Sequence, residues 1–291
     1  MKPRLGAASS NKSWGFYFSA DPLGHVLKSA LSIGASESLL AVSIEMILFF
    51  LGLISFVAWF FSMLAGGGSP LVLIPLVNVW FGAAAVAPVI TMGMLVGNTQ
   101  RSLFFWKEID WWVTLWYVPG AIAGGALGAY AFTKIHLEWM QLLIGAALVL
   151  MGLNYWFGKR DYQFQTKAWY FLPFGFLYAF GSGLIGSTGP IINPLYLNYG
   201  LVKEKMVATK SLNVAVTHVV KILTYLALGA FTKPYLLYGL IIGVAAIPAN
   251  LLGKWVLSKM SAEQFRQGVM MFIAFSGVLM LWQQRSLLWG W

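Results

Sequence analysis

Long apolar runs separated by short polar connections occupy most of this chain. Several runs reach about 20 residues, the length that a helix needs to cross the hydrocarbon core of a bilayer. The strict alternation of apolar and polar residues expected of a membrane barrel is absent. The pattern therefore predicts an all-α polytopic membrane protein. The expected helical elements cover residues 44–65, 70–80, 83–105, 111–133, 138–157, 169–186, 190–199, 205–229, 234–258 and 263–284.

Two apolar runs are interrupted by glycine, a hydroxyl residue and proline. The interruptions are Gly66-Gly67-Gly68-Ser69-Pro70 and Gly186-Ser187-Thr188-Gly189-Pro190. Glycine costs about 1 kcal/mol relative to alanine inside a helix, whereas proline suits the first helical position. We therefore expect each interruption to end one helix and to begin another inside the membrane. Ser69 would cap the helix beginning at Pro70, and Thr188 the helix beginning at Pro190.

The two halves of the chain resemble each other. One gapless register aligns Gly128 with Gly253, Lys134 with Lys259, Glu138 with Glu263 and Gly152 with Gly277. We interpret this as an internal duplication. Each half crosses the membrane five times if its short element completes a span, or three times if that element turns back. Both numbers are odd, so the second half is expected to be inverted.

This duplication predicts how the chain is divided. The expected parts are an N-terminal extension (1–43), a first transmembrane repeat (44–157), a connector (158–168) and a second transmembrane repeat (169–284). Each repeat would contain one broken helix pair and three spanning helices, which makes about ten helical elements in all.

A helix that begins inside a membrane favours an anion at its first turn, because its backbone N–H groups carry partial positive charge. Two inverted breaks would present two such ends to one central anion, as in transporters with broken helices. The alternative is that the glycines only let helices pack closely, the role we assign to Gly120, Gly124 and Gly128. The recurrence of glycine, hydroxyl and proline at both breaks favours a binding site.

Polar side chains inside the neighbouring runs support this interpretation. Lys210, Asn213, Thr217 and Lys221 recur at helical spacing on one face. Ionisable residues within a membrane are functional candidates, although a long basic side chain can also extend to the interface. His218 either relays a proton or forms a hydrogen bond between helices. The candidate substrate-binding residues are Gly66, Gly67, Gly68, Ser69, Asn98, Arg101, Gly186, Ser187, Thr188, Gly189, Asn193, Lys210 and Asn213.

Composition narrows the function classes. The formal charge is +10, but lysine and arginine lie mainly between apolar runs, as topology determinants do, so no nucleic-acid partner is expected. There is no cysteine, and the three histidines are scattered. Cofactor motifs, metal-ligand helices and acid–base pairs beside the breaks are missing. We therefore expect no enzyme, no metal and no cofactor.

The pattern Gly-Gly-Gly-x-Pro-Leu-x-x-x-Pro from Gly66, its degenerate copy from Gly186 and the pair Ala208-Thr209 resemble the sulfite exporter TauE/SafE family. The resemblance covers residues 44–284. It implies a multi-pass permease of the plasma (inner) membrane whose partners are the lipid bilayer and a small anionic sulfur compound. We expect a secondary transporter that exports sulfite or an organosulfonate by alternating access; a passive anion channel is the alternative. The coupling ion and the oligomeric state stay open.

The glycine triplet makes the binding hypothesis testable. Replacing Gly67 with leucine should abolish transport, because the side chain would fill the space in which an anion approaches the backbone. Insertion into the membrane should be largely preserved. Flux measurements on correctly inserted Gly67→Leu protein provide the check, and wild-type flux would assign the triplet to helix packing instead.

Overall fold

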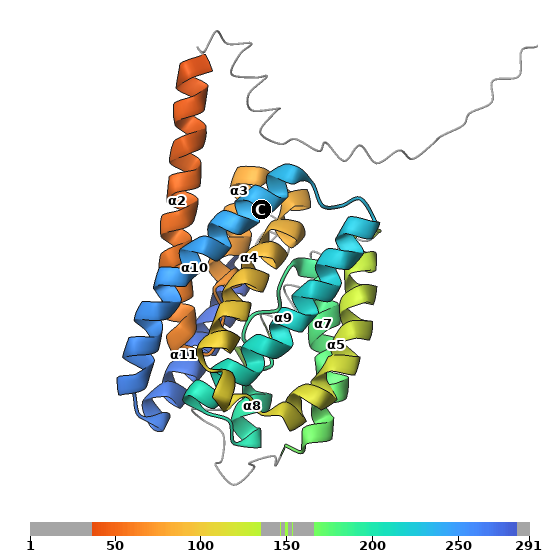
Figure 1. Cartoon of the computed structure of the whole chain (residues 1–291), viewed down its shortest axis with the longest axis vertical. Helices are drawn as coiled ribbons and strands as arrows, with labels where there is room; N and C mark the ends of the chain where they lie inside the picture. The colour runs from red at the N-terminus through yellow and green to blue at the C-terminus, as the bar shows by residue number, and fades with distance from the viewer. Residues whose placement is uncertain (1–36, 135–145, 147–148, 151–152, 154–165, 284–291) are drawn as a thin grey trace, which may run out of the picture.

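The computed structural model describes residues 37–134, 146, 149, 150, 153 and 166–283 (Figure 1). These residues form nine α-helices and no strand. The helices are α2 (Glu37–Leu64), α3 (Pro70–Phe81), α4 (Ala83–Phe104), α5 (Trp111–Phe132), α7 (Phe171–Ile185), α8 (Asn193–Tyr199), α9 (Lys203–Ala227), α10 (Lys233–Lys259) and α11 (Ala262–Gln283). Short 3-10 turns, η1 (Trp106–Glu108) and η2 (Ala168–Tyr170), precede α5 and α7. Most of the expected element 138–157 and of the connector lies outside the described residues.

Nine of the ten expected helical elements are confirmed, and most begin and end within three residues of the prediction. Two expected starts differ from the structure, and the first is that of α8, which begins at Asn193 and not at Pro190. The segment after Pro190 forms a turn in which the backbone N–H of Asn193 donates to the Pro190 carbonyl at 2.9 Å. The second proline, Pro194, occupies the first turn of α8, where its missing N–H is not needed. At the other end of the chain, α2 begins at Glu37, before the expected residue 44.

Four helical stretches of the described chain are long and apolar enough to cross a bilayer. They are Ile44–Leu64, Ala168–Ile185, Lys203–Ala227 and Lys233–Lys259. Large apolar side chains such as Phe49, Leu115 and Leu223 are exposed on the outside of the bundle, while cationic and amide side chains are buried inside it. This distribution suits a protein whose surface meets lipid.

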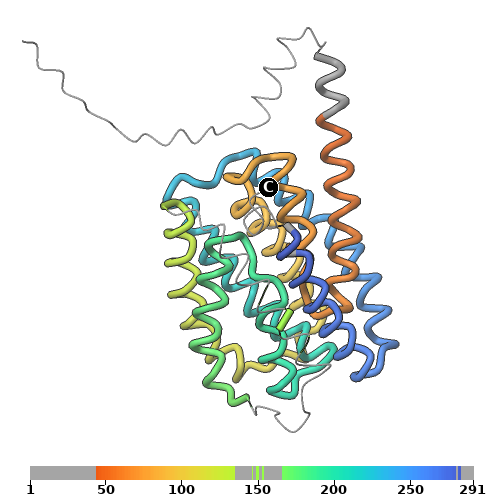
Figure 2. The backbone as a smooth tube through the Cα atoms, turned by 180° about the vertical axis from the view of Figure 1, so that it is seen from behind, coloured from red at the N-terminus to blue at the C-terminus, as the bar shows by residue number. Residues whose placement is uncertain are grey.

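The chain turns back after α2. The end of α2 packs against the late part of α10, where Met63 meets Gly253. The end of α3 lies against the early part of α10, where Phe81 stacks on Tyr238 with 4.1 Å between ring centroids. Helix α3 therefore carries the chain back toward the end from which α2 came (Figures 1 and 2). The two helices form a hairpin.

The second half contains a corresponding hairpin. Phe171 at the start of α7 contacts Tyr196 and Tyr199 near the end of α8, with ring centroids 4.8 Å and 5.7 Å apart. The segment from α7 to α8 therefore also returns to the level at which α7 begins. Of the two arrangements left open by the sequence, both short helices adopt the one that turns back.

Helices from one half of the chain pack against helices from the other half. Helix α5 packs chiefly against α7 and α9, whereas α10 packs chiefly against α2 and α4, and α4 and α9 pack against each other. The predicted packing role of the glycines in α5 is confirmed. A Cβ added at Gly120, Gly124 or Gly128 would overlap the backbone of α7, because the two helix backbones are in direct contact there.

Neighbouring glycines of α5 provide a matched test of this contact. Gly124→Ala should destabilise the protein by about 1–3 kcal/mol, because the new methyl group meets the Phe176 backbone, which cannot move aside. Gly125→Ala should be neutral or stabilising, since its Cβ would lie 3.5 Å from Val220, an ordinary contact. Thermal unfolding of both variants in detergent gives the comparison. Equal midpoints would show that the close approach of α5 and α7 is not needed for stability.

Candidate functional site

The segments that follow α2 and α7 meet beside α4 and α9 and line a cavity of about 30 Å³. Ten of the residues singled out from the sequence line it: Gly66, Gly67, Gly68, Ser69, Asn98, Arg101, Ser187, Gly189, Lys210 and His218. The other four candidates, Gly186, Thr188, Asn193 and Asn213, are buried nearby but do not line it. The fold thus brings both breaks and two distant cationic side chains to one place. We call this space the cationic cavity.

The glycine triplet adopts a backbone conformation that favours glycine. The φ angles are +65° at Gly66, +126° at Gly67 and +118° at Gly68. A Cβ added at Gly67 would lie 2.5 Å from the Lys210 Nζ atom. The absence of side chains here therefore lets the Lys210 amine approach the backbone directly.

Lys210 joins the first break to the start of α8. Its Nζ donates to the Gly66 carbonyl at 2.8 Å and to the Asn193 side-chain oxygen. The side-chain amide of Asn193 in turn donates to the Ala65 carbonyl at 3.4 Å. Lys210 is only 6% exposed, so its side chain does not extend to the interface. It binds the C-terminal end of α2 and holds the start of α8 against it.

Arg101 reaches the same end of α2 from α4. Its Nε donates to the Asn250 side-chain oxygen at 2.7 Å, Nη1 to Ser62 Oγ at 3.2 Å and Nη2 to the Trp59 carbonyl at 2.8 Å. Its guanidinium also lies 4.5 Å from the Trp59 ring centroid. Like Lys210, Arg101 is buried, and its acceptors among the described residues are all uncharged.

Lys221 is the counterpart of these residues at the other break. Its Nζ donates to the Gly186 carbonyl at 2.7 Å and to Ser182 Oγ at 3.0 Å. The side chain is completely buried, so the alternative in which it extends to the interface was wrong. Lys221 does not line the cationic cavity; it binds the C-terminal end of α7.

The predicted hydroxyl caps were wrong. Ser69 is at the N-cap of α3, but its own backbone is helical (φ −48°, ψ −33°) and its side chain makes no capping hydrogen bond. A capping residue normally has extended backbone, which aims its oxygen at the first amides. Ser69 Oγ instead lies 3.6 Å from Met94 Sδ. Thr188 Oγ1 donates to the Tyr178 carbonyl, away from any helix start.

The first amides of α3 are also partly occupied. The Leu71 amide donates to the Gly68 carbonyl at 3.0 Å, and Leu73 donates to Ser69 at 3.2 Å. Helix α8 begins at Asn193, which does not line the cavity. The expectation of two equivalent positive helix ends at one anion is therefore not met. The positive character of the cavity comes mainly from Arg101 and Lys210.

His218 lines the cationic cavity and is completely buried. Neither of its ring nitrogens has a hydrogen-bond partner within the described part of the chain. Buried polar atoms without partners are uncommon, which makes this imidazole available to a ligand or a proton in the cavity.

Among the residues that the structure describes, no aspartate or glutamate lines the cationic cavity. Among the described residues the one ion pair joins Lys203 and Glu204 at 3.5 Å, at the start of α9. The two cationic side chains of the cavity therefore have no counter-charge beside them from the described part of the chain. An anion bound there would supply one.

Sequence reasoning missed several lining residues: Trp59, Ser62, Met94, Tyr178, Val207, Ser211 and Val214. A helical signal was available for two of them. Trp59 and Ser62 precede Gly66 by seven and four residues, so they share the face of α2 that leads into the break. The contribution of Asn250, which orients Arg101, had no local signal because the two residues are far apart in the chain.

The apolar exterior and the buried polar interior define a polytopic helical membrane protein. Residues 51–280 match the family described as sulfite exporter TauE/SafE, and the chain belongs to this family. The resemblance inferred from the glycine motifs is thus confirmed. Comparisons with curated proteins and with solved structures gave no match. At the family level, membership implies membrane transport of a small sulfur-containing anion and not an enzymatic activity.

The three hydrogen bonds of Arg101 predict a stability effect. Arg101→Lys keeps the charge but replaces the planar fork with a single amine, which leaves Asn250 or the α2 end without a donor. We expect a loss of about 1–3 kcal/mol, the typical effect of leaving a buried polar group unpaired. The matched control is Arg266→Lys on α11, where the arginine is partly exposed. Thermal unfolding measures both, and equal midpoints would contradict the bridging role.

Proposed function

We propose that this protein is a secondary transporter that exports sulfite or a small organosulfonate across the plasma (inner) membrane by alternating access. The observation that carries the proposal is the cationic cavity, in which Arg101 and Lys210 are buried and no carboxylate of the described residues lies beside them. Such a site favours a small anion over a cation or a neutral solute. Family membership supplies sulfur chemistry as the context.

The substrate oxyanion would replace part of the present hydrogen bonding of Lys210. The Lys210 amine, the outer edge of the Arg101 guanidinium and the Asn98 amide would donate to its oxygens. Glycine at positions 66–68, together with Ser69, Ser187 and Gly189, would let it approach the backbone. Asn193 would act as a positioning residue, because it holds Lys210 in place. Gly186, Thr188 and Asn213 would support the second break without touching the substrate.

Alternating access would use two inverted halves, residues 44–157 and 169–284. The packing of α5 and α10 supports this arrangement. Helix α5 of the first half packs against α7 and α9 of the second, and α10 of the second half packs against α2 and α4 of the first. One further register supports the duplication: a single shift aligns Ser62 with Ser182, Gly66 with Gly186, Pro70 with Pro190 and Arg101 with Lys221. Arg101 and Lys221 each bind the C-terminal end of the broken helix in their own half.

The burial of the polar side chains that line the cavity favours a transporter over a passive channel. The polar side chains that line it are 8% exposed or less, as for Asn98, Lys210 and Ser187. A channel would need a continuous water-filled path, whereas a transporter passes through a closed state with its site between two gates. His218 is the proposed proton-carrying residue, since its unpaired imidazole lies in the same cavity.

Flux of radiolabelled sulfite into proteoliposomes tests the proposal. We expect saturable uptake that is accelerated by unlabelled sulfite on the opposite side, which a channel does not show. Lys210→Gln should weaken apparent affinity by about 10–100-fold, the equivalent of one charge-assisted hydrogen bond. The matched control is Lys254→Gln, because Lys254 lies outside the cavity and donates to the Phe104 carbonyl.

Two results would contradict the proposal. Conductance without saturation or exchange would assign the protein to the channel class. Equal losses of flux in Lys210→Gln and Lys254→Gln would remove the cationic cavity from the transport path.

A further inference from the structure

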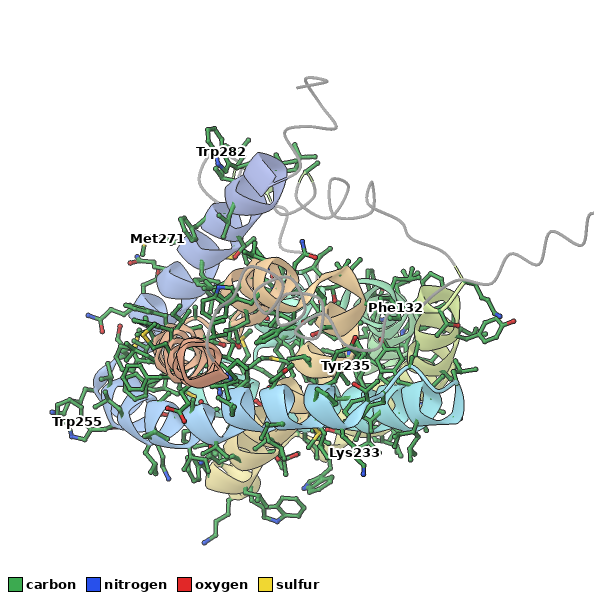
Figure 3. The ribbon with its side chains drawn as sticks, turned by 90° about the horizontal axis from the view of Figure 1, so that it is seen from above. Phe132, Lys233, Tyr235, Trp255, Met271 and Trp282 are labelled. Atoms are coloured by element: carbon green, nitrogen blue, oxygen red, sulfur yellow. The ribbon has the colours of Figure 1, made fainter. Side chains whose placement is uncertain are left out.

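A second cavity lies beside the cationic cavity, between α2, α3 and α11. Its volume is about 460 Å³, within the range of about 300–1,000 Å³ found for small-molecule pockets. Seen from above, α11 diverges from the rest of the bundle (Figure 3). Apart from Ser69, all the residues that line this second cavity are apolar or glycine; they include Ile54, Val57, Phe61, Val72, Phe272 and Phe275. We call this space the apolar cavity.

The two cavities share one wall. Gly68 and Ser69 line both of them. Gly68 has φ +118°, and the ring of Phe272 occupies the position that a Cβ at residue 68 would take. The Gly68 backbone and the Phe272 ring therefore separate the cationic cavity from the apolar cavity at this point. A rotation of Phe272 away from Gly68 would join the polar and the apolar space.

We propose that the apolar cavity binds the hydrocarbon tail of an amphiphilic organosulfonate whose sulfonate group occupies the cationic cavity. This inference rests on the proposed function. Charge complementarity determines the position of the head group, because Arg101 and Lys210 are buried there. Gly68 and Ser69 line both cavities, so the hydrocarbon tail would extend from the cationic cavity past these two residues into the apolar cavity.

The sizes of the two spaces support this division. The cationic cavity, at about 30 Å³, has room for about two waters, so it suits a head group and no large substituent. An organic substituent must extend beyond it, and apolar space adjoins it at Gly68. The apolar cavity also opens to the outside of the bundle, because Phe61 and Met271 at its rim are more than half exposed. A substrate that partitions into the bilayer therefore has a lateral route to the site.

Inhibition of sulfite flux by linear alkanesulfonates, from methanesulfonate to octanesulfonate, measures tail binding. In wild-type protein the inhibition constant should fall with chain length, by at most about fourfold per methylene buried. Val57→Trp fills the apolar cavity from α2 and should flatten this dependence. It should leave sulfite flux and inhibition by methanesulfonate unchanged, because Val57 does not line the cationic cavity.

Val244→Trp is the matched control: Val244 is 57% exposed on α10 and lines neither cavity. Partition of the sulfonates into the vesicles is the same for all three proteins, so it cancels in the comparison. Equal chain-length dependence in wild type and Val57→Trp would overturn the proposal and assign the apolar cavity to lipid chains.

A second measurement separates this inference from the proposed function. Equilibrium binding of hexanesulfonate and methanesulfonate to protein in lipid nanodiscs needs no transport. Preferential loss of hexanesulfonate binding in Val57→Trp would support the tail site even if sulfite flux were absent. Identical binding ratios in wild type and Val57→Trp would overturn it even if sulfite were transported.

Discussion

The structure depends on how buried cationic side chains are accommodated between apolar helices. A lysine or arginine cannot remain in such surroundings without acceptors, because the loss of hydration is too costly. Here the acceptors are uncharged groups at the ends of broken helices. Lys210 binds the Gly66 carbonyl and Lys221 the Gly186 carbonyl, where the negative end of each helix lies. The breaks and the cations therefore require each other: a continuous helix would use these carbonyls internally.

This mutual requirement also explains why the cationic cavity would accept the anion that we propose as its substrate. A carboxylate partner would neutralise Arg101 and Lys210 permanently. Neutral carbonyl and amide acceptors satisfy their hydrogen bonds but leave the charge uncompensated, so in the proposed function an incoming oxyanion would exchange with a weak acceptor. The glycine triplet adds the space for this exchange, since a side chain at Gly67 would collide with the Lys210 amine.

Much of this arrangement was predictable from the sequence. Apolar run length and the glycine–proline interruptions predicted nearly all the described helices, and the repeated glycine motif indicated the family. Ten of the candidate site residues line one cavity. The errors concern local geometry. The second break ends in Pro190 and a further proline, Pro194, follows it; the chain forms a turn after Pro190, so α8 begins only at Asn193. Ser69 has the residue type of a helix cap but not the backbone conformation.

The sequence by itself determined which segments are helical and where they break, because run length, glycine and proline act locally. It also identified most of the polar residues that an apolar bundle must accommodate. Tertiary structure decided which acceptor each of them meets. Asn250 reaches Arg101 from another helix, Lys221 is buried instead of extending to the interface, and Phe272 closes against Gly68. These contacts join residues far apart in the chain, so their geometry depends on how the helices pack and not on local pattern.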